Sequence, residues 1–401
     1  MCCIAGENVS KDGSVLSINK VPYEEIWNSE YMLNARRSMS KGLRLKACER
    51  CYQEEGAVGT SRRVQMNEYW LSEDSPPPEE IFKTAEKLGW RVKARPIFLQ
   101  LNMGNLCNLA CRMCSSEYSS RISRDPVHNK WMPPPYLVDD EITRFAKLGG
   151  WWSQKELMFG EILSEPLECR RIIFQGGEPL IIKEFGEILD YLIEKEAGDN
   201  LVIELTTNMT RVSDNLIDKL KRFKRVDLGC SIDGISEVLE YIRYPAKWDK
   251  VLANLMKFYG MENIIPSFNV AIQAYNLMSI TDLYRYCDEN NILVQAHFLA
   301  GPAYLHVLVL PINARNIALE RLNKYIDTSP APGNIASAQY LVHFLEQYSH
   351  VHHIEHIRNF MLFTNDMDAS RNQCFADTYP ELFELFIEEG YPWIQDTQHA
   401  S

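Results

Sequence analysis

Three cysteines lie close together in one short segment of the chain, Cys107, Cys111 and Cys114, with the spacing C-x3-C-x2-C. An apolar run comes directly before them, and Gly104-Asn105 is typical of a loop at the end of a strand. A loop can direct three thiolates toward one point, whereas three cysteines along one helix face would form an unusual buried stripe. Three thiolates are one fewer than a closed zinc or four-iron site requires. The pattern therefore predicts a four-iron cluster with one iron open to a small molecule.

A second group of residues that could bind a ligand is Gly176-Gly177-Glu178-Pro179, at the end of the next apolar run. Two glycines let a backbone approach a ligand closely. Their amides and carbonyls, together with the carboxylate of Glu178, can hold an ammonium group. Alone, the motif fits a simple strand-to-helix turn equally well. Its position one βα unit after the cysteines favours the binding role.

Strands and helices alternate from residue 93 onward. The apolar segments expected as strands are 96–102, 171–175, 201–207, 226–232, 267–273 and 292–298. The helical patterns that follow most of them are 183–196, 213–223, 235–243, 247–260 and 279–290. Such repeats predict an α/β fold with a parallel sheet or barrel, and six units are too few for the usual eight-stranded barrel. We therefore expect an open, partial (β/α)6 barrel whose site lies at the carboxyl ends of the strands.

The chain is expected to divide into four parts. Residues 1–72 form a small cysteine-flanked domain, and 73–92 form a linker with a short helix, because three consecutive prolines favour an extended connector. Residues 93–311 form the barrel, with a long insertion at 115–170 that contains one expected helix, 138–148. Residues 312–401 form a helical extension, with helices at 312–327, 335–357 and 378–389.

Composition excludes some classes of function. The net charge of -12 argues against a general nucleic-acid-binding protein and against binding to an anionic membrane surface. No signal peptide or membrane-spanning run is visible, so a cytoplasmic location is expected. Seven of the 11 cysteines are clustered, which in a reducing compartment indicates metal or redox chemistry. The other four, Cys169, Cys230, Cys287 and Cys374, are interpreted as small core residues.

Taken together, these motifs closely resemble the radical S-adenosylmethionine (SAM) superfamily over residues 97–300. Thr206-Thr207-Asn208 is similar to the family's T-N-G segment, with Met209 in place of the usual glycine. Ser231-Ile232-Asp233-Gly234 is similar to its S-x-D-G segment near the SAM ribose. Arg243 matches an arginine that pairs with the SAM carboxylate in several peptide-modifying members, a role suited to the two-pronged guanidinium.

The resemblance implies a [4Fe-4S] cluster whose open iron is chelated by the amino and carboxylate groups of SAM. Reduction would cleave SAM to methionine and a 5′-deoxyadenosyl radical, which abstracts hydrogen from a peptide or small-molecule substrate. An electron donor of the flavodoxin or ferredoxin type is implied, and no catalytic acid or base is identified. The residues implied to bind the cofactor are Gly176, Gly177, Glu178, Thr207, Asn208, Ser231, Asp233 and Arg243.

A second cysteine group lies near the start of the chain. Cys48-x-x-Cys51 alone could bind zinc, iron or nothing, but together with Cys2 and Cys3 it supplies up to four thiolates. This segment is similar to the auxiliary-cluster domain called twitch, which is related to SPASM, and this implies a second Fe-S cluster. In that group a further cysteine and a Pro-Trp segment usually precede the paired cysteines. Three alternatives follow: a start codon assigned too late, use of both Cys2 and Cys3, or an incomplete cluster.

Two other readings of the sequence compete with the enzyme. One is a cluster-bearing electron-transfer protein without catalysis, which would have no use for the residues of a SAM pocket. The other is a zinc hydrolase, because His352, Glu355 and His356 match H-x-x-E-H, and on a helix both histidines would share a face. Asp366-Met367-Asp368 resembles the start of a calcium loop, but Arg371 stands where that loop needs glycine.

Overall fold

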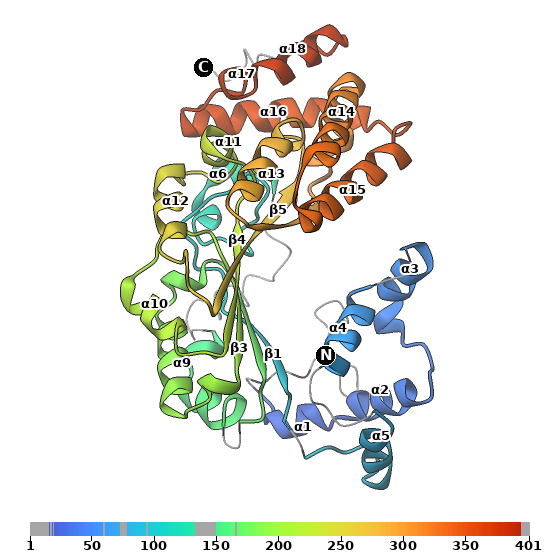
Figure 1. Ribbon diagram of the computed structural model, residues 1–401, viewed down its shortest axis with the longest axis vertical. Coiled ribbons are helices and arrows are strands. Elements are labelled where there is room, and N and C mark those ends of the chain that lie inside the picture. Colours follow the sequence, from blue (N-terminus) through green and yellow to red (C-terminus); the bar gives the residue numbers. More distant parts are fainter. Residues whose placement is uncertain are drawn as a thin grey trace. The chain divides into compact units, whose positions relative to one another are not determined.

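The computed structural model describes residues 16, 18, 20–58, 61–72, 78–93, 95–132, 150–164 and 167–393 (Figure 1). The chain splits into two compact units. One comprises Met1–Ile97 and Leu148–Glu168, and the other comprises Phe98–Lys147 and Cys169–Ser401. The four-part division expected from the sequence stays a prediction.

The second unit is built around a six-stranded parallel sheet. Its strands are β1 (Phe98–Asn102), β2 (Arg171–Gln175), β3 (Val202–Thr207), β4 (Arg225–Ser231), β5 (Ile264–Ile272) and β6 (Leu293–Phe298). They are hydrogen-bonded in sequence order, so that β1 and β6 are the two edges of this sheet. The predicted α/β fold with an open, partial barrel is thereby confirmed.

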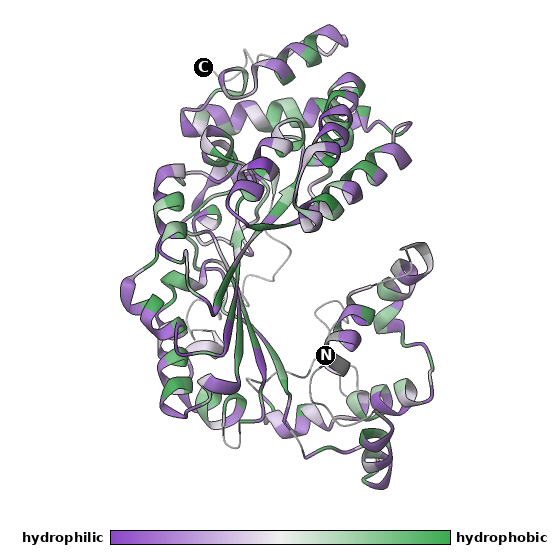
Figure 2. Ribbon diagram, in the orientation of Figure 1, coloured by the Kyte–Doolittle hydropathy of each residue, from purple (hydrophilic) through white to green (hydrophobic). Residues whose placement is uncertain are grey.

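Apolar and polar side chains alternate along the strands, and this explains which face of the sheet the helices cover. Ile172, Phe174 and Ile203 have no exposed surface and lie on the face that the helices cover. Figure 2 shows both hydrophobic and hydrophilic residues along the strands. Glu204 and Asp227 are paired in register on the opposite, polar face, as expected for side chains that alternate between faces. The burial of one apolar face fixes the register of the strands.

Helices follow the strands as the sequence predicts, and α9, α10 and α12 lie along the outer side of the sheet (Figure 1). The helices of this unit are α6 (Pro126–Trp131), α9 (Lys183–Glu194), α10 (Asp214–Leu220), α11 (Ser236–Ile242), α12 (Trp248–Met256), α13 (Ile280–Glu289), α14 (Ile312–Thr328), α15 (Pro332–Gln347), α16 (Ile354–Arg371), α17 (Phe375–Thr378) and α18 (Pro380–Glu388). The expected helix 138–148 lies outside the described residues.

One predicted helix, 335–357, is wrong, because the structure has two helices there. α15 ends at Gln347 and α16 begins at Ile354. The guanidinium of Arg315 donates hydrogen bonds to the carbonyls of Tyr348 and Val351, at 3.3 and 2.7 Å. These contacts hold the intervening segment as a turn.

No helix among the described residues is both long and apolar enough to cross a bilayer.

The first unit consists of short helices. They are α1 (Tyr23–Trp27), α2 (Glu30–Ser40), α3 (Glu49–Val58), α4 (Arg62–Ser72), α5 (Pro78–Lys87) and α8 (Lys155–Leu157). Ser29 caps α2, since its hydroxyl accepts a hydrogen bond from the amide of Met32 at 3.4 Å. The Asn28 side chain exchanges two hydrogen bonds with the backbone of Val92, at 3.0 and 2.9 Å. These contacts tie the first helices to the end of the segment that follows α5.

Removal of a buried ring from the covered face of the sheet should destabilise the second unit. Phe174 has no exposed surface and packs edge-on against Phe185, with ring centroids 4.9 Å apart. We expect Phe174→Ala to lower the free energy of unfolding by about 3–5 kcal/mol, through lost burial and the cavity left behind. Urea unfolding measures this. The exposed Gln295→Ala on the opposite face should change it by no more than about 0.5 kcal/mol. Equal losses in both variants would contradict this account.

Candidate functional site

A cavity of about 550 Å³ lies at the carboxyl ends of the first four strands. Most of the site residues named from the sequence line this cavity, namely Cys107, Cys111, Cys114, Gly176, Gly177, Thr207, Asn208, Ser231 and Arg243. Because the carboxyl ends of parallel strands meet at one edge, side chains far apart in sequence converge here. Glu178 and Asp233 are not among the lining residues.

The cysteines lie in the cluster loop, defined here as residues 103–116. Between the end of β1 and Cys111 the loop contains no helix, as the sequence predicts. Its backbone is held by the segment after α11, since the amide of Ala110 donates to Tyr244 O at 2.7 Å and the amide of Arg112 donates to Ile242 O at 2.8 Å. These two bonds flank Cys111 and fix its position at the cavity.

Cys111 is buried, the other two cysteines of the cluster loop are half-buried, and the guanidinium of Arg243 lies close by. Burial raises the pKa of Cys111 to about 12 and that of Cys114 to about 11. Donors approach two of the sulfurs, with Asn208 Nδ2 at 3.9 Å from Cys107 Sγ and Arg243 Nη1 at 3.9 Å from Cys111 Sγ. Hydrogen bonds to sulfur are a feature of iron–sulfur sites. The residues present therefore fit a cluster that binds deprotonated thiols.

Neither the cysteine triplet nor the histidine pair is arranged to hold a single metal ion in the described part of the chain. Across the part of the chain that the structure describes, no three His, Cys, Asp or Glu side chains are placed to hold one ion. In a four-iron cluster each cysteine ligates a different iron, so its sulfurs lie farther apart than the ligands of one ion. The predicted shared helical face of His352 and His356 is wrong, because α16 begins at Ile354 and His352 precedes it.

The two glycines after β2 pack directly against the cluster loop. Gly176 has a φ of +138°, and a Cβ added to it would lie 2.8 Å from Gly104 O. A Cβ on Gly177 would lie 2.4 Å from Leu106 O. The amides of Gly177 and Glu178 donate to Gly104 O and Leu106 O, at 2.7 and 2.8 Å. Glycine is required here for close approach of two backbones.

Glu178 lies behind the cavity wall and holds the residues that form it. Its side chain is buried, and its carboxylate accepts hydrogen bonds from Thr207 Oγ1 at 2.8 Å, from the amide of Asn208 at 2.6 Å and from the amide of Leu180 at 3.1 Å. Burial raises the pKa of Glu178 to about 7, although these hydrogen bonds oppose the shift. The carboxylate therefore orders the turn after β3, and its direct contact with SAM stays a prediction.

Arg243 is the one charged side chain among the described residues that line the cavity. Its Nε lies 2.8 Å from Asp233 Oδ2, and the other oxygen of Asp233 accepts from the amide of Ala271 at 2.8 Å. Burial lowers the pKa of the Arg243 guanidinium, but Asp233 and Cys111 outweigh this and hold the pKa above its ordinary value. Asp233 thus fixes a permanent cation at the cavity, which suits a ligand with a carboxylate.

The second cysteine pair lies in the first unit. Cys48 ends a short 3-10 turn, Lys46–Cys48, and Cys51 is buried in the first turn of α3. The guanidinium of Arg63 lies 5.1 Å from the ring centroid of Tyr52, which follows Cys51. Hydrogen bonding to Glu55 raises the pKa of Arg63, and Cys48 contributes to the shift, so this cation lies near a cysteine. Cys2 and Cys3 lie outside the described residues.

Sequence reasoning missed several residues of the cavity. Met113, Tyr118 and Met132 line it from the cluster loop and the segment after it, and Gly301-Pro302 line it from the segment after β6. Met113 lies between two of the cysteines and could have been identified from that position alone. The others carry no local signal, because only the folded chain brings them to the cavity.

A comparison with protein families identifies the central part of the chain. The family model described as "Radical SAM superfamily" matches residues 101–272, which include the three cysteines, the end of β1 and all of β2 to β5. This segment, which is less than half of the chain, is thus similar to radical SAM proteins. The radical SAM match thus spans the cluster loop, both glycines and Arg243, all of which meet at the cavity.

Similar proteins include two curated proteins and one solved structure. A probable GTP 3′,8-cyclase of Methanocaldococcus jannaschii is 23% identical over 211 residues, which is 52% of this chain and 60% of the cyclase. The mycofactocin maturase MftC of Mycolicibacterium smegmatis is 25% identical over 161 residues, which is 40% of this chain and 33% of the maturase. The crystal structure of Streptococcus suis SuiB bound to SAM matches with 17% identity and a TM-score of 0.40, covering 70% and 59% of the two chains. The chain spans less than two thirds of the length of each.

A side chain at Gly177 should push the cluster loop away from the cavity. The backbone of Leu106 cannot yield as a flexible side chain would, so we expect Gly177→Ala to weaken SAM binding roughly tenfold. Anaerobic isothermal titration of the reconstituted protein measures the affinity. Gly186→Ala is the matched control, because Gly186 lies in α9 with only the end of the Lys219 side chain near, at 3.7 Å. Unchanged affinity in Gly177→Ala would contradict the close packing described here.

Proposed function

We propose that the chain binds a [4Fe-4S] cluster through Cys107, Cys111 and Cys114 and cleaves SAM reductively at that cluster. The supporting observation is that these cysteines share one cavity with two glycines and a single cation, Arg243. When bound, the cluster and SAM supply the chemistry, in which SAM is split to methionine and a 5′-deoxyadenosyl radical that abstracts hydrogen from a substrate. The alternative of an electron-transfer protein gives no reason for a cation beside the cysteines.

The roles of this chain's own residues are to orient SAM and to exclude water. The Arg243 guanidinium would bind the SAM carboxylate, since arginine donates two parallel hydrogen bonds to such a group. The exposed backbone at Gly176 and Gly177 would receive the amino group. The hydroxyl of Ser231 lies at the end of β4, where it can reach the ribose. The buried walls of the cavity would shield the reaction from solvent.

The substrate is proposed to be a peptide or a small natural product, with a flavodoxin or ferredoxin as electron donor. The N-terminal segment supports this, because it resembles the twitch and SPASM domains of peptide- and metabolite-modifying radical SAM enzymes. One curated relative is named a mycofactocin maturase and another a probable GTP 3′,8-cyclase.

The first unit is proposed to hold an auxiliary Fe-S cluster through Cys48 and Cys51, with Cys2 and Cys3 completing the set. Two arginines, Arg44 and Arg63, lie over the ring of Tyr52 at 4.9 and 5.1 Å from its centroid. Arg63 is itself paired with Glu55 at 2.6 Å. The metal-binding role is therefore supported by the spacing of Cys48 and Cys51 and by the resemblance of this segment to twitch.

The first test of this proposal is formation of 5′-deoxyadenosine. The protein is reconstituted anaerobically with iron and sulfide, reduced and mixed with SAM, and the product is measured by chromatography. Wild type should form it, and Cys111→Ala should form none because the cluster loses a ligand. Cys287→Ala removes a buried thiol in α13 and should remain active. A wild-type protein that retains its iron but forms no 5′-deoxyadenosine would refute the catalytic proposal.

Iron content tests the auxiliary cluster separately. Two four-iron clusters predict about eight irons per chain, and one predicts about four. The double variant Cys48→Ala/Cys51→Ala should lose about half of the iron and keep the cluster that binds SAM. Iron is measured by colorimetric assay after reconstitution. An unchanged iron content in the double variant would show that these cysteines hold no cluster.

A further inference from the structure

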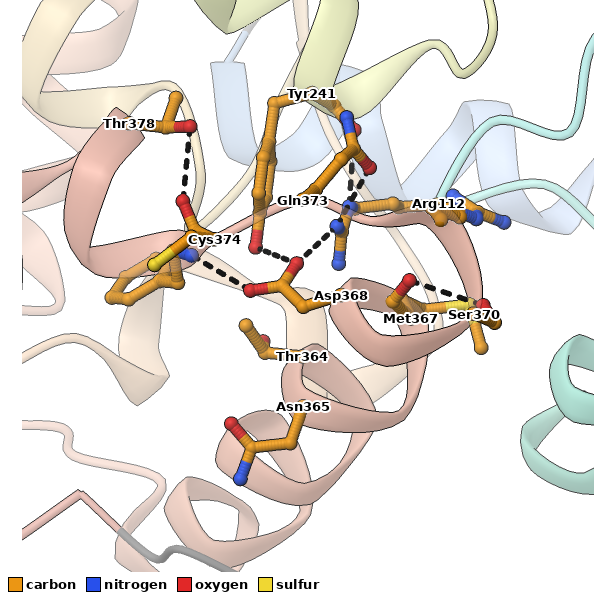
Figure 3. Close-up of polar contacts among 12 residues, drawn as sticks. Arg112, Tyr241, Thr364, Asn365, Met367, Asp368, Ser370, Gln373, Cys374 and Thr378 are labelled. Carbon is orange, nitrogen blue, oxygen red and sulfur yellow. Dashed lines mark hydrogen bonds and ion pairs between the residues drawn. The ribbon is translucent and has the colours of Figure 1, made fainter.

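Arg112 connects the cluster loop to a distant part of the chain (Figure 3). It directly follows Cys111, and its side chain has no exposed surface. Its Nη2 lies 2.5 Å from Asp368 Oδ1 and 3.0 Å from Gln373 Oε1, and its Nε donates to Tyr241 O at 3.0 Å. Asp368 lies in the last turn of α16, 256 residues away in sequence. A buried cation inside the cluster loop is thus neutralised by the helical extension.

The carboxylate of Asp368 is fully engaged around Arg112 (Figure 3). Its Oδ1 also accepts from the hydroxyl of Tyr241 at 2.7 Å, and its Oδ2 accepts from the amide of Phe375 at 2.7 Å. The guanidinium lies 3.7 Å from the centroid of the Tyr241 ring. Burial lowers the pKa of Arg112, but the rings of Tyr241 and Tyr275 and the carboxylate outweigh this and hold the pKa above its ordinary value. The guanidinium is thus held in one geometry by the carboxylate and the two rings.

The same end of α16 reaches the cluster loop at a second point. Arg371 Nη2 lies 3.0 Å from His128 Nδ1, and His128 Nε2 lies 2.9 Å from Cys114 O. A carbonyl can only accept, so Nε2 carries the hydrogen and Nδ1 accepts from Arg371. His128 is completely buried. The helix therefore supports the loop on both sides of Met113, the residue between these contacts that lines the cavity.

A third contact concerns the other acidic residue of the Asp366-Met367-Asp368 motif. Asp366 Oδ2 accepts from Trp131 Nε1 at 2.7 Å, and Trp131 precedes Met132, which lines the cavity. The two carboxylates thus serve different segments, both of which lead to the cavity. This gives the motif that resembled a calcium loop a different role.

We propose that Asp368 is a positioning residue for the SAM-binding cluster, which acts by holding Arg112 and with it the adjacent cysteine of the loop. The proposal rests on the proposed function for the identity of the cluster. Without its carboxylate, Arg112 would be a buried and unpaired cation, which is strongly unfavourable. Its movement toward solvent would displace Cys111, because the two residues are consecutive. The competing account is that the pair only fastens the helical extension to the barrel.

The test is the rate at which the reconstituted, full-length protein releases iron to a chelator under anaerobic conditions. Asp368→Ala should release the iron of the SAM-binding cluster roughly tenfold faster or more, since a hydrogen bond between two charged groups is lost. Asp368→Asn should lie between this variant and wild type, because its amide oxygen can still accept from Arg112. The portion of iron that is absent from Cys111→Ala identifies this cluster.

Two control variants separate positioning from general loss of stability. Glu355→Gln removes an exposed carboxylate from the first turn of α16 and should match wild type within about twofold. Phe386→Leu loosens a buried contact in α18 that does not involve Arg112. If Phe386→Leu releases iron as fast as Asp368→Ala, or if Asp368→Ala matches wild type, the proposal is overturned.

Three further outcomes are decisive. If Asp368→Ala does not fold, Asp368→Asn takes its place and must release iron faster than wild type, or the proposal fails. Wild type can retain its iron, and the variants can release iron in the expected order, while no 5′-deoxyadenosine forms. That result would refute the proposed catalysis but not the positioning role of Asp368. If Cys111→Ala binds as much iron as wild type, the cluster assignment fails and the positioning role of Asp368 fails with it.

Discussion

Pairing of buried charge is the constraint on which the site depends. Arg112 within the cluster loop and Arg243 beside it are both buried cations, and a charge in the interior is tolerated only with a partner. Asp368 partners the first and Asp233 the second. The end of α16 and the end of β4 therefore cannot move independently of the loop that carries the cysteines. These two carboxylates therefore hold the site from two distant parts of the sequence.

The barrel could be predicted from sequence because its information is local. Apolar runs of five to nine residues mark the strands, amphipathic patterns mark the helices, and the alternation of the two implies a parallel sheet. That parallel sheet brings its carboxyl ends to one edge. Cys107, Gly176, Thr207 and Ser231 each follow or end a strand, so their meeting at one cavity follows from topology alone.

The contact of the helical extension with the cluster loop could not be predicted, since no local sequence pattern indicates it. The side chains of Asp368 and Arg112 meet across 256 residues, and an acidic pair on a helix is usually a solvated surface. The break between α15 and α16 was missed for a similar reason. It is held by Arg315 of α14, whose guanidinium donates to two carbonyls of the turn, so a tertiary contact overrides the local helix propensity.

Two of the motif residues predicted to bind the cofactor bind neighbouring protein groups. Glu178 and Asp233 direct their carboxylates at neighbouring protein groups, namely the turn after β3 and the guanidinium of Arg243. The polar surface offered to a ligand therefore comes from backbone at two glycines, from hydroxyl and amide side chains and from one oriented cation. Such a surface distinguishes between ligands by their shape and by whether they carry a negative charge opposite the cation. It suits a ligand that brings its own carboxylate and that would complete the iron coordination proposed for the three cysteines.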